Sequence, residues 1–130
     1  MGPETSPDSP VRRRLRSFRY AIRGIGAMLA SEPNARIHAL ATGLVVAAGF
    51  GFGIDRSEWL AVALAIGAVW AAEGMNPAFE ALCDVASPDH HPRVERAKDV
   101  AAGAVLAAAL AALAVAALVF GPRILERLSA

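Results

Sequence analysis

Long apolar stretches alternate with short polar breaks along the chain, and this pattern predicts its helices. Apolar residues fill most of three stretches, 39–54, 59–85 and 100–120. A bilayer core needs roughly 20 apolar helical residues to span it. The third stretch has this length, the second has it if Glu73 is tolerated, and Ile37 with a little tilt extends the first. We therefore expect spanning helices at about 35–54, 57–86 and 94–120.

The segment before these stretches predicts an amphipathic helix over residues 11–31. Its apolar residues recur at steps of three and four: Val11, Leu15, Phe18, Ile22, Ile25 and Leu29. Arginines occupy much of the other side, at 12, 13, 16, 19 and 23. A basic amphipathic helix of this kind lies on an anionic lipid surface. The alternative, an RNA-binding arm, needs aromatic stacking or a recognised module that is missing here, so no nucleic-acid partner is expected.

Prolines and cap residues set the expected helix ends. Pro33 lacks a backbone donor and breaks the surface helix, so the next helix should begin near Asn34 as N-cap. Ser57 is the expected N-cap of the second spanning helix, and Gly121-Pro122 should end the third. Residues 1–10, with three prolines and no apolar run, predict a disordered tail.

Glycines at 49, 51 and 53 lie in apolar sequence with no lysine after them. They resemble a phosphate-binding loop only superficially, and close helix packing is the better interpretation. Residues 11–121 then form a single domain, followed by a short tail at 122–130.

Composition and charge add a topology. The chain has 130 residues, 55% of them hydrophobic, and a mean hydropathy of +0.42. A water-soluble bundle with a very apolar core is the alternative to a membrane protein. Seven of the 13 Lys and Arg residues precede residue 39 and three more lie in 84–99. By the positive-inside rule, we expect the N-terminus and the 84–99 loop to lie in the cytoplasm. The expected location of the protein is the inner membrane.

A polar stripe interrupts the second apolar stretch. Its members fall within about 80° on one helix face, over about 16 Å: Glu73, Asn76, Glu80 and Asp84. Residues 59–72 carry no charge, and ionisable groups inside a spanning helix usually mark a functional site. Glu73 is expected roughly 9 Å inside the membrane boundary, as a general base or, alternatively, as the partner of a group on another helix. Pro77 should kink the helix.

Further acids and a lysine point to phosphate chemistry. Glu80 and Glu32 are candidate Mg²⁺ ligands at the membrane boundary, although each could be an ordinary interfacial acid. Lys98 is placed to meet a phosphate or simply to extend toward water. The histidines have no zinc-site spacing, and no nucleotide-binding loop motif is present. A nucleotide site would therefore need packed helices, assembled between subunits.

Two segments resemble signatures of the prokaryotic diacylglycerol kinase family. Glu73-Gly-Met-Asn76-Pro-Ala-Phe-Glu80-Ala-Leu-Cys-Asp84 is similar to E-x-x-N-[ST]-A-[IF]-E-x-x-x-D, and Ala97-Lys98-Asp99-Val-Ala-Ala-Gly-Ala-Val105 to A-K-D-x-[AG]-[AS]-[AG]-A-V. Phe18-Arg-Tyr-Ala21, Gly24 and the run from Glu32 to His38 also match. The likeness covers about residues 12–120. The Asn34–His38 run and His91-Pro92 look more like the undecaprenol kinase branch. Pro77 departs from the family's Thr or Ser.

The resemblance implies a homotrimer of chains with three transmembrane helices and a surface helix each. It implies that Glu73 is the catalytic base, that Glu32 and Glu80 hold Mg²⁺ and contact ATP, and that Lys98 and Asp99 organise the nucleotide. Further residues match nucleotide-contacting positions: Arg13, Tyr20, Asp89, His90 and His91. Supporting or substrate-contacting residues are Asn76, Arg36 and Trp59.

The resulting hypothesis is an ATP- and Mg²⁺-dependent kinase of a membrane lipid alcohol, undecaprenol or diacylglycerol, acting at the cytoplasmic face. One rival is a catalytically silent membrane scaffold or partner subunit, favoured only by Pro77. Another is a small ion or proton pathway built on Glu73. A pathway would need polar residues continuing outward from Glu73, and residues 59–72 offer none.

Overall fold

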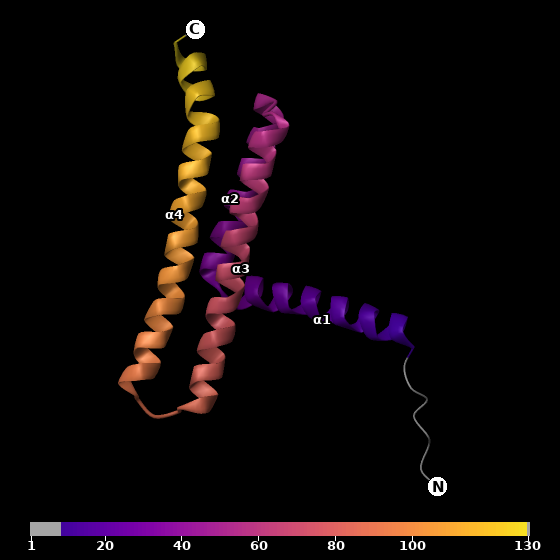
Figure 1. Ribbon diagram of the computed structural model, residues 1–130, viewed down its shortest axis with the longest axis vertical. Helices are drawn as coiled ribbons and strands as arrows, with labels where there is room; N and C mark the ends of the chain where they lie inside the picture. Colours follow the sequence, from indigo (N-terminus) through magenta and orange to yellow (C-terminus); the bar gives the residue numbers. More distant parts are fainter. Residues whose placement is uncertain (1–8, 130) are drawn as a thin grey trace.

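The computed structural model describes residues 9–129, which form four helices (Figure 1). These are α1 (Pro10–Ser31), α2 (Pro33–Phe52), α3 (Arg56–Ala86) and α4 (Pro92–Leu128). Helices α2, α3 and α4 run along one another, and α1 projects sideways from them (Figure 1). Each of these three is long and apolar enough to cross a membrane. The predicted all-α fold with three candidate spans is confirmed. Residues 1–8 of the predicted tail lie outside the described residues, and Ser9 and Pro10 belong to the start of α1.

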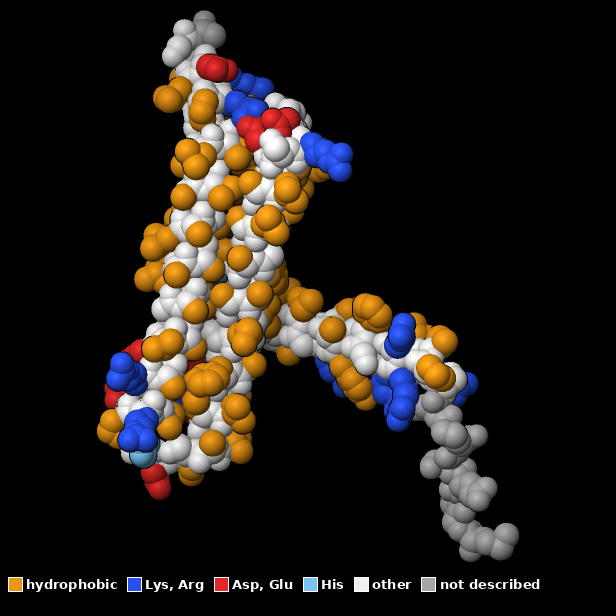
Figure 2. All heavy atoms as spheres, viewed as in Figure 1, with side chains coloured by type: hydrophobic (Ala, Val, Ile, Leu, Met, Phe, Trp, Pro, Cys, Tyr) orange, Lys and Arg blue, Asp and Glu red, His pale blue; other side chains and the backbone are white. Residues whose placement is uncertain are grey.

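Helix α1 leaves most of its apolar side chains uncovered by protein, except near its end, where Met28 is buried. Leu15, Phe18 and Ile22 are all exposed, and arginines share the helix surface with them (Figure 2). Ser9 caps the helix by accepting a hydrogen bond from the Arg12 amide. An apolar stripe beside arginines suits a helix that lies on a lipid surface, as the sequence predicts.

A single extended residue separates α1 from α2. Glu32 has φ −99° and ψ 114°, and Pro33 is the first residue of α2, so the expected N-cap at Asn34 is wrong by two positions. Arg36 reaches back from α2, donating from Nε to the Leu29 carbonyl at 2.9 Å and from its second terminal nitrogen to the Ala30 carbonyl. The last carbonyls of a helix lack intrahelical donors, so Arg36 caps α1 and fixes its angle to α2.

The turn between α2 and α3 is closed by a capping box. Gly53 ends α2 with φ 64°, a left-handed conformation that glycine adopts without strain. Asp55, rather than the expected Ser57, is the N-cap of α3: its carboxylate accepts from the amides of Ser57 and Glu58 at 2.7 and 2.9 Å. Glu58 accepts in return from the Asp55 amide. Hydrogen bonds from the Ser57 hydroxyl and then from the Glu58 amide lower the pKa of Asp55.

Helix α4 does not end at Gly121-Pro122, and that prediction is wrong. The helix continues to Leu128 with Pro122 inside it, so residues 122–128 are helical rather than a tail. Arg123 donates to both oxygens of Glu58 at 2.8 Å and to the Val119 carbonyl at 2.6 Å. The bonds to Glu58 tie α4 to α3, and the bond to Val119 joins the turns of α4 on either side of the proline. The missing proline donor is therefore not enough to stop the helix here.

The most buried apolar cluster lies near this same end of the bundle. It consists of Ile54, Val62, Val119 and Phe120. Gly49 is buried beside it, and a Cβ at this position would lie 2.6 Å from the Trp59 ring. The aromatic ring rests where only a glycine leaves room. Close packing of α2 and α3 at Gly49, which the sequence suggested, is confirmed.

Gly49→Leu should lower the free energy of unfolding by about 1–3 kcal/mol, because the new side chain must displace Trp59. Thermal unfolding in detergent, followed by circular dichroism, measures the change. Gly51→Leu is the matched control, since a Cβ at Gly51 meets nothing within 4 Å. Equal unfolding midpoints for the two variants would contradict the packing argument.

Candidate active site

Glu73 is the one charged residue that is buried among those the structure describes. It retains 4% of its surface and lies in the second half of α3. Its Oε2 atom is 3.8 Å from His38 Nε2 of α2, and the two side chains are 5% and 20% exposed. A buried acid thus faces a half-buried imidazole across the α2–α3 interface.

A second polar contact between the same helices lies one helical turn away. Trp70 Nε1 of α3 donates to Thr42 Oγ1 of α2 at 3.0 Å. The Thr42 hydroxyl donates in turn to the His38 carbonyl at 2.8 Å. Residues three or four apart share a helix face, so Trp70 and Glu73 on α3 oppose Thr42 and His38 on α2. We call these four residues the polar ladder, because they join the two helices at successive turns.

Beyond Glu73, acids of α3 meet a lysine of α4. Lys98 Nζ lies 2.5 Å from Asp84 Oδ1 and 3.9 Å from Glu80 Oε1. The pair is partly open to solvent, with exposed fractions of 31% for the Lys98 side chain and 65% for that of Asp84. Exposed pairs contribute little to stability, so this arrangement holds charge in place more than it holds the fold together.

The α3–α4 connection adds two histidines to this region. His91 caps α4 by accepting the Arg93 amide on Nδ1 at 3.2 Å, and His90 Nε2 is 3.7 Å from Glu95 Oε2. A cavity of about 320 Å³ opens here. Most of its lining is polar or charged: Asp84, Ser87, Asp89, His90, His91, Glu95, Lys98 and Asp99. We call it the polar cavity.

The structure brings one part of the predicted site together. Five expected nucleotide-binding residues line the polar cavity, Asp89, His90, His91, Lys98 and Asp99, and Glu80 joins them through Lys98. Asn76 is half-buried on α3 between Glu73 and Glu80. Asp84, the last residue of the polar stripe, lies nearer to Lys98 than Glu80 does.

Other predicted residues lie elsewhere in the single chain. Arg13 and Tyr20 are exposed on α1, Arg36 caps that helix, and Glu32 sits at the α1–α2 junction, where it accepts from the Ser31 hydroxyl. Trp59 lies at the start of α3, about 21 Å along the helix from Glu73. A single chain therefore does not place Trp59 near the acid.

No motif or spacing in the sequence indicates a role for His38 in catalysis. A histidine near the start of an apolar stretch was the only signal, and its partner is 35 positions away in the chain. Only the packing of α2 on α3 shows which side chain it faces.

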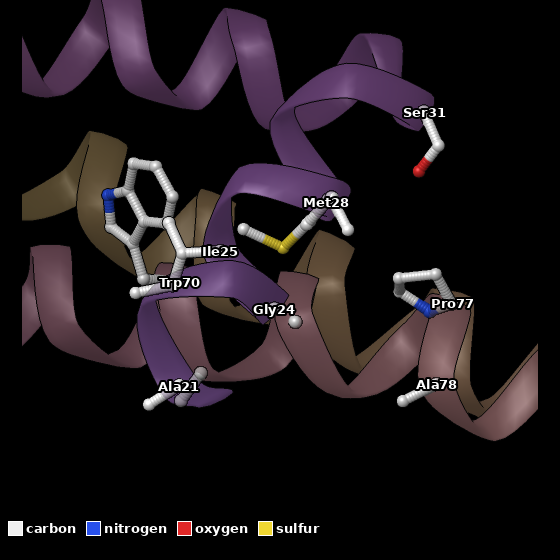
Figure 3. Close-up of a pocket in the computed structure, with 11 residues that line it drawn as sticks. Ala21, Gly24, Ile25, Met28, Ser31, Trp70, Pro77 and Ala78 are labelled. Carbon is white, nitrogen blue, oxygen red and sulfur yellow. The ribbon is translucent and has the colours of Figure 1, made fainter. Parts of the chain in front are cut away.

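An apolar cavity of about 580 Å³ lies between α1 and α3 (Figure 3). Met28 of α1 packs over Gly74, where a Cβ would lie 3.7 Å from the sulfur, and Trp70 and Pro77 of α3 contribute to the wall (Figure 3). Helix α3 continues through Pro77, although proline cannot donate to the Glu73 carbonyl. The departure from the family pattern thus lies on the wall of this cavity.

The donors for a divalent metal are separated in one chain. Within residues 9–129, no three His, Cys, Asp or Glu side chains converge as metal ligands. Glu32 and Glu80 offer the carboxylate oxygens that Mg²⁺ prefers, and Mg²⁺ commonly takes only one or two such ligands beside water and phosphate. The two residues therefore fit Mg²⁺ by donor type, at separate places in the chain.

Three apolar helices with a buried acid and a charged cavity at one end define a small helical membrane protein with a polar site. Residues 19–120 match the prokaryotic diacylglycerol kinase family. The chain belongs to this family, and it is accordingly a lipid kinase, which uses a nucleotide as phosphoryl donor.

Two relatives illustrate the match. The chain is 35% identical over 114 residues to undecaprenol kinase of Bacillus subtilis, covering 88% of this chain and 93% of that protein. It is 35% identical over 113 residues to diacylglycerol kinase of Synechocystis sp., covering 86% of this chain and 65% of that protein.

A double-mutant cycle tests the polar ladder. Trp70→Phe and Thr42→Val each remove one partner of the Nε1–Oγ1 hydrogen bond. Valine keeps the size of threonine, and the volume lost in Trp70→Phe is common to both arms of the cycle and cancels. The coupling energy between them should be about 0.6 kcal/mol, the average for hydrogen bonds between membrane helices. Unfolding of the four proteins in detergent provides the measurement. Strictly additive effects would show that the two helices are not joined by this bond.

Proposed function

We propose that this protein transfers the γ-phosphoryl group of ATP to the hydroxyl of a membrane lipid alcohol, undecaprenol in preference to diacylglycerol, in an Mg²⁺-dependent reaction. The reaction takes place at the cytoplasmic face of the inner membrane. The likeness of the Asn34–His38 run and of His91-Pro92 to the undecaprenol kinase branch supports the lipid preference. The two relatives do not decide it, because each is 35% identical to this chain.

The observation that carries the proposal is the burial of Glu73 on a helix that continues to the polar cavity. From Glu73 to Glu80 the helix rises about 10 Å, from an apolar environment to an exposed carboxylate beside Lys98. A lipid hydroxyl would approach Glu73 from the apolar side of this stretch of α3, and a nucleotide phosphate would approach Glu80 from the aqueous side. Helix α3 therefore carries acidic groups suited to both substrates on one face.

In the proposed reaction, Glu73 accepts the proton of the lipid hydroxyl as its oxygen attacks the γ-phosphorus. The new oxygen–phosphorus bond forms as the bond to the β-phosphate oxygen breaks, and ADP leaves. Lys98 neutralises phosphate charge, and His90, His91, Asp89 and Asp99 surround the nucleotide from the α3–α4 connection. Positioning and electrostatics supply most of the catalysis in phosphoryl transfer.

Glu32 and Glu80 would hold Mg²⁺, which would offset the negative charge of the phosphates. Glu32 stands at the α1–α2 junction and Glu80 beside Lys98, so we propose that a neighbouring copy completes the site. The expected assembly is a homotrimer, with Arg13 and Tyr20 of the surface helix available to an adjacent nucleotide.

Purified protein in lipid nanodiscs, given labelled ATP and either undecaprenol or diacylglycerol, tests the proposal. We expect a labelled lipid phosphate from undecaprenol at a higher kcat/KM than from diacylglycerol, and loss of product when a chelator removes Mg²⁺. Label transfer to neither lipid would contradict the function. A preference for diacylglycerol would correct the substrate alone.

Glu73→Gln should reduce kcat by about 10²- to 10⁴-fold, because an amide cannot take the hydroxyl proton. The KM for ATP should change little, since Glu73 lies apart from the polar cavity. Glu126→Gln, an exposed acid in the last turn of α4, is the matched control and should retain wild-type rates. Full turnover by Glu73→Gln would remove the general-base assignment while leaving the kinase activity intact.

A further inference from the structure

We infer that His38 is the positioning residue of Glu73: its imidazole holds one carboxylate oxygen, so that the other is directed to the acceptor hydroxyl. This inference rests on the proposed function. His38 Nε2 lies 3.8 Å from Glu73 Oε2, which is longer than a hydrogen bond, and catalytic contacts of this kind commonly tighten to hydrogen-bond length when substrate binds. Glu73 Oε1 is the oxygen left for the substrate.

Other cations near this part of the bundle have different partners. Arg36, half a turn before His38 on α2, donates to the Leu29 and Ala30 carbonyls. Lys98 lies against Asp84 and Glu80. Among the described residues, His38 is the basic side chain within 4.0 Å of the Glu73 carboxylate. The orientation of the acid therefore depends on this histidine.

The polar ladder explains how His38 reaches Glu73. Trp70 and Thr42 fix the register of α3 on α2, and the Thr42 hydroxyl bonds to the His38 carbonyl itself. This hydrogen bond holds the backbone of His38 at the α2–α3 interface. The imidazole therefore lies close to Glu73, and the His38 side chain is only 20% exposed. Rotating either helix by the 100° that separates successive residues would turn its side chain away from the other one.

Fixing the carboxylate matters for rate. A free glutamate side chain samples several rotamers, and ordering it costs conformational entropy at each turnover. Misplacing a reacting group by about 1 Å can cost 10²-fold in rate. The imidazole can donate from Nε2 both in one neutral tautomer and in its charged form, so it can hold the acid before and during proton transfer.

The test compares His38→Ala and His38→Gln in nanodiscs with undecaprenol. The alanine variant should lose about 10- to 100-fold in kcat, with the KM for ATP within about twofold of wild type. The glutamine variant should recover most of kcat, because its amide nitrogen can donate from nearly the same place as Nε2. Leu40→Ala, an exposed neighbour on α2, is the matched control and should keep wild-type kinetics.

Wild-type kcat in His38→Ala would overturn the inference, as would equal losses in the alanine and glutamine variants. A second measurement does not depend on turnover. The ring-nitrogen NMR signals of ¹⁵N-labelled His38 should shift between the wild type and Glu73→Gln, and unchanged signals would also overturn the inference. A wild type that phosphorylates no lipid refutes the proposed function instead, and the NMR result then still reports on the contact.

Discussion

The arrangement of this protein depends on keeping one carboxylate inside an apolar helix pair. Removing an acid from water is unfavourable unless polar groups around it replace the solvent. Glu73 meets this requirement at the α2–α3 interface, where His38 faces it and Trp70 and Thr42 satisfy each other nearby. The polar residues of α2 must then face α3. The apolar side chains on the rest of α2 are left to face lipid. The buried acid Glu73 thus determines which residues of α2 face α3 and where along α3 they lie.

The two ends of the bundle are built differently. Around the α2–α3 turn, a capping box, the Glu58–Arg123 pair and the Ile54–Phe120 cluster close the structure tightly. At the other end, the side chains of Asp84 and Glu80 are largely exposed and cavities open beside them. Side chains that are open to solvent can rearrange around a ligand, whereas the closed end keeps the helices aligned. The division gives a fixed scaffold with an adaptable polar site.

Local patterns were enough to predict the four helices and the acidic stripe, because apolar runs and residue spacing are written in neighbouring positions. The helix ends were predicted less well. Asp55 displaced Ser57 as cap because Glu58 completes a capping box, and α4 passes Pro122 because Arg123 finds Glu58, 65 positions earlier in the chain. The role of His38 required the α2–α3 contact. Sequence reasoning therefore failed where a distant partner decided the outcome.

The position of Glu73 on a helix that leads to the polar cavity also bears on how the proposed reaction brings its two substrates together. A lipid alcohol cannot leave the bilayer and a nucleotide cannot enter it, so the reacting atoms can meet only at the boundary. In the proposed arrangement, helix α3 crosses that boundary with the buried acid at one depth and exposed acids at the next, and α4 adds Lys98 from the side. The membrane would confine the lipid substrate to its plane, so that only the nucleotide has to be brought to the boundary. The proposed reaction therefore needs an acid deep enough to take the proton of the lipid hydroxyl, at a depth where that hydroxyl can still receive the γ-phosphoryl group of ATP.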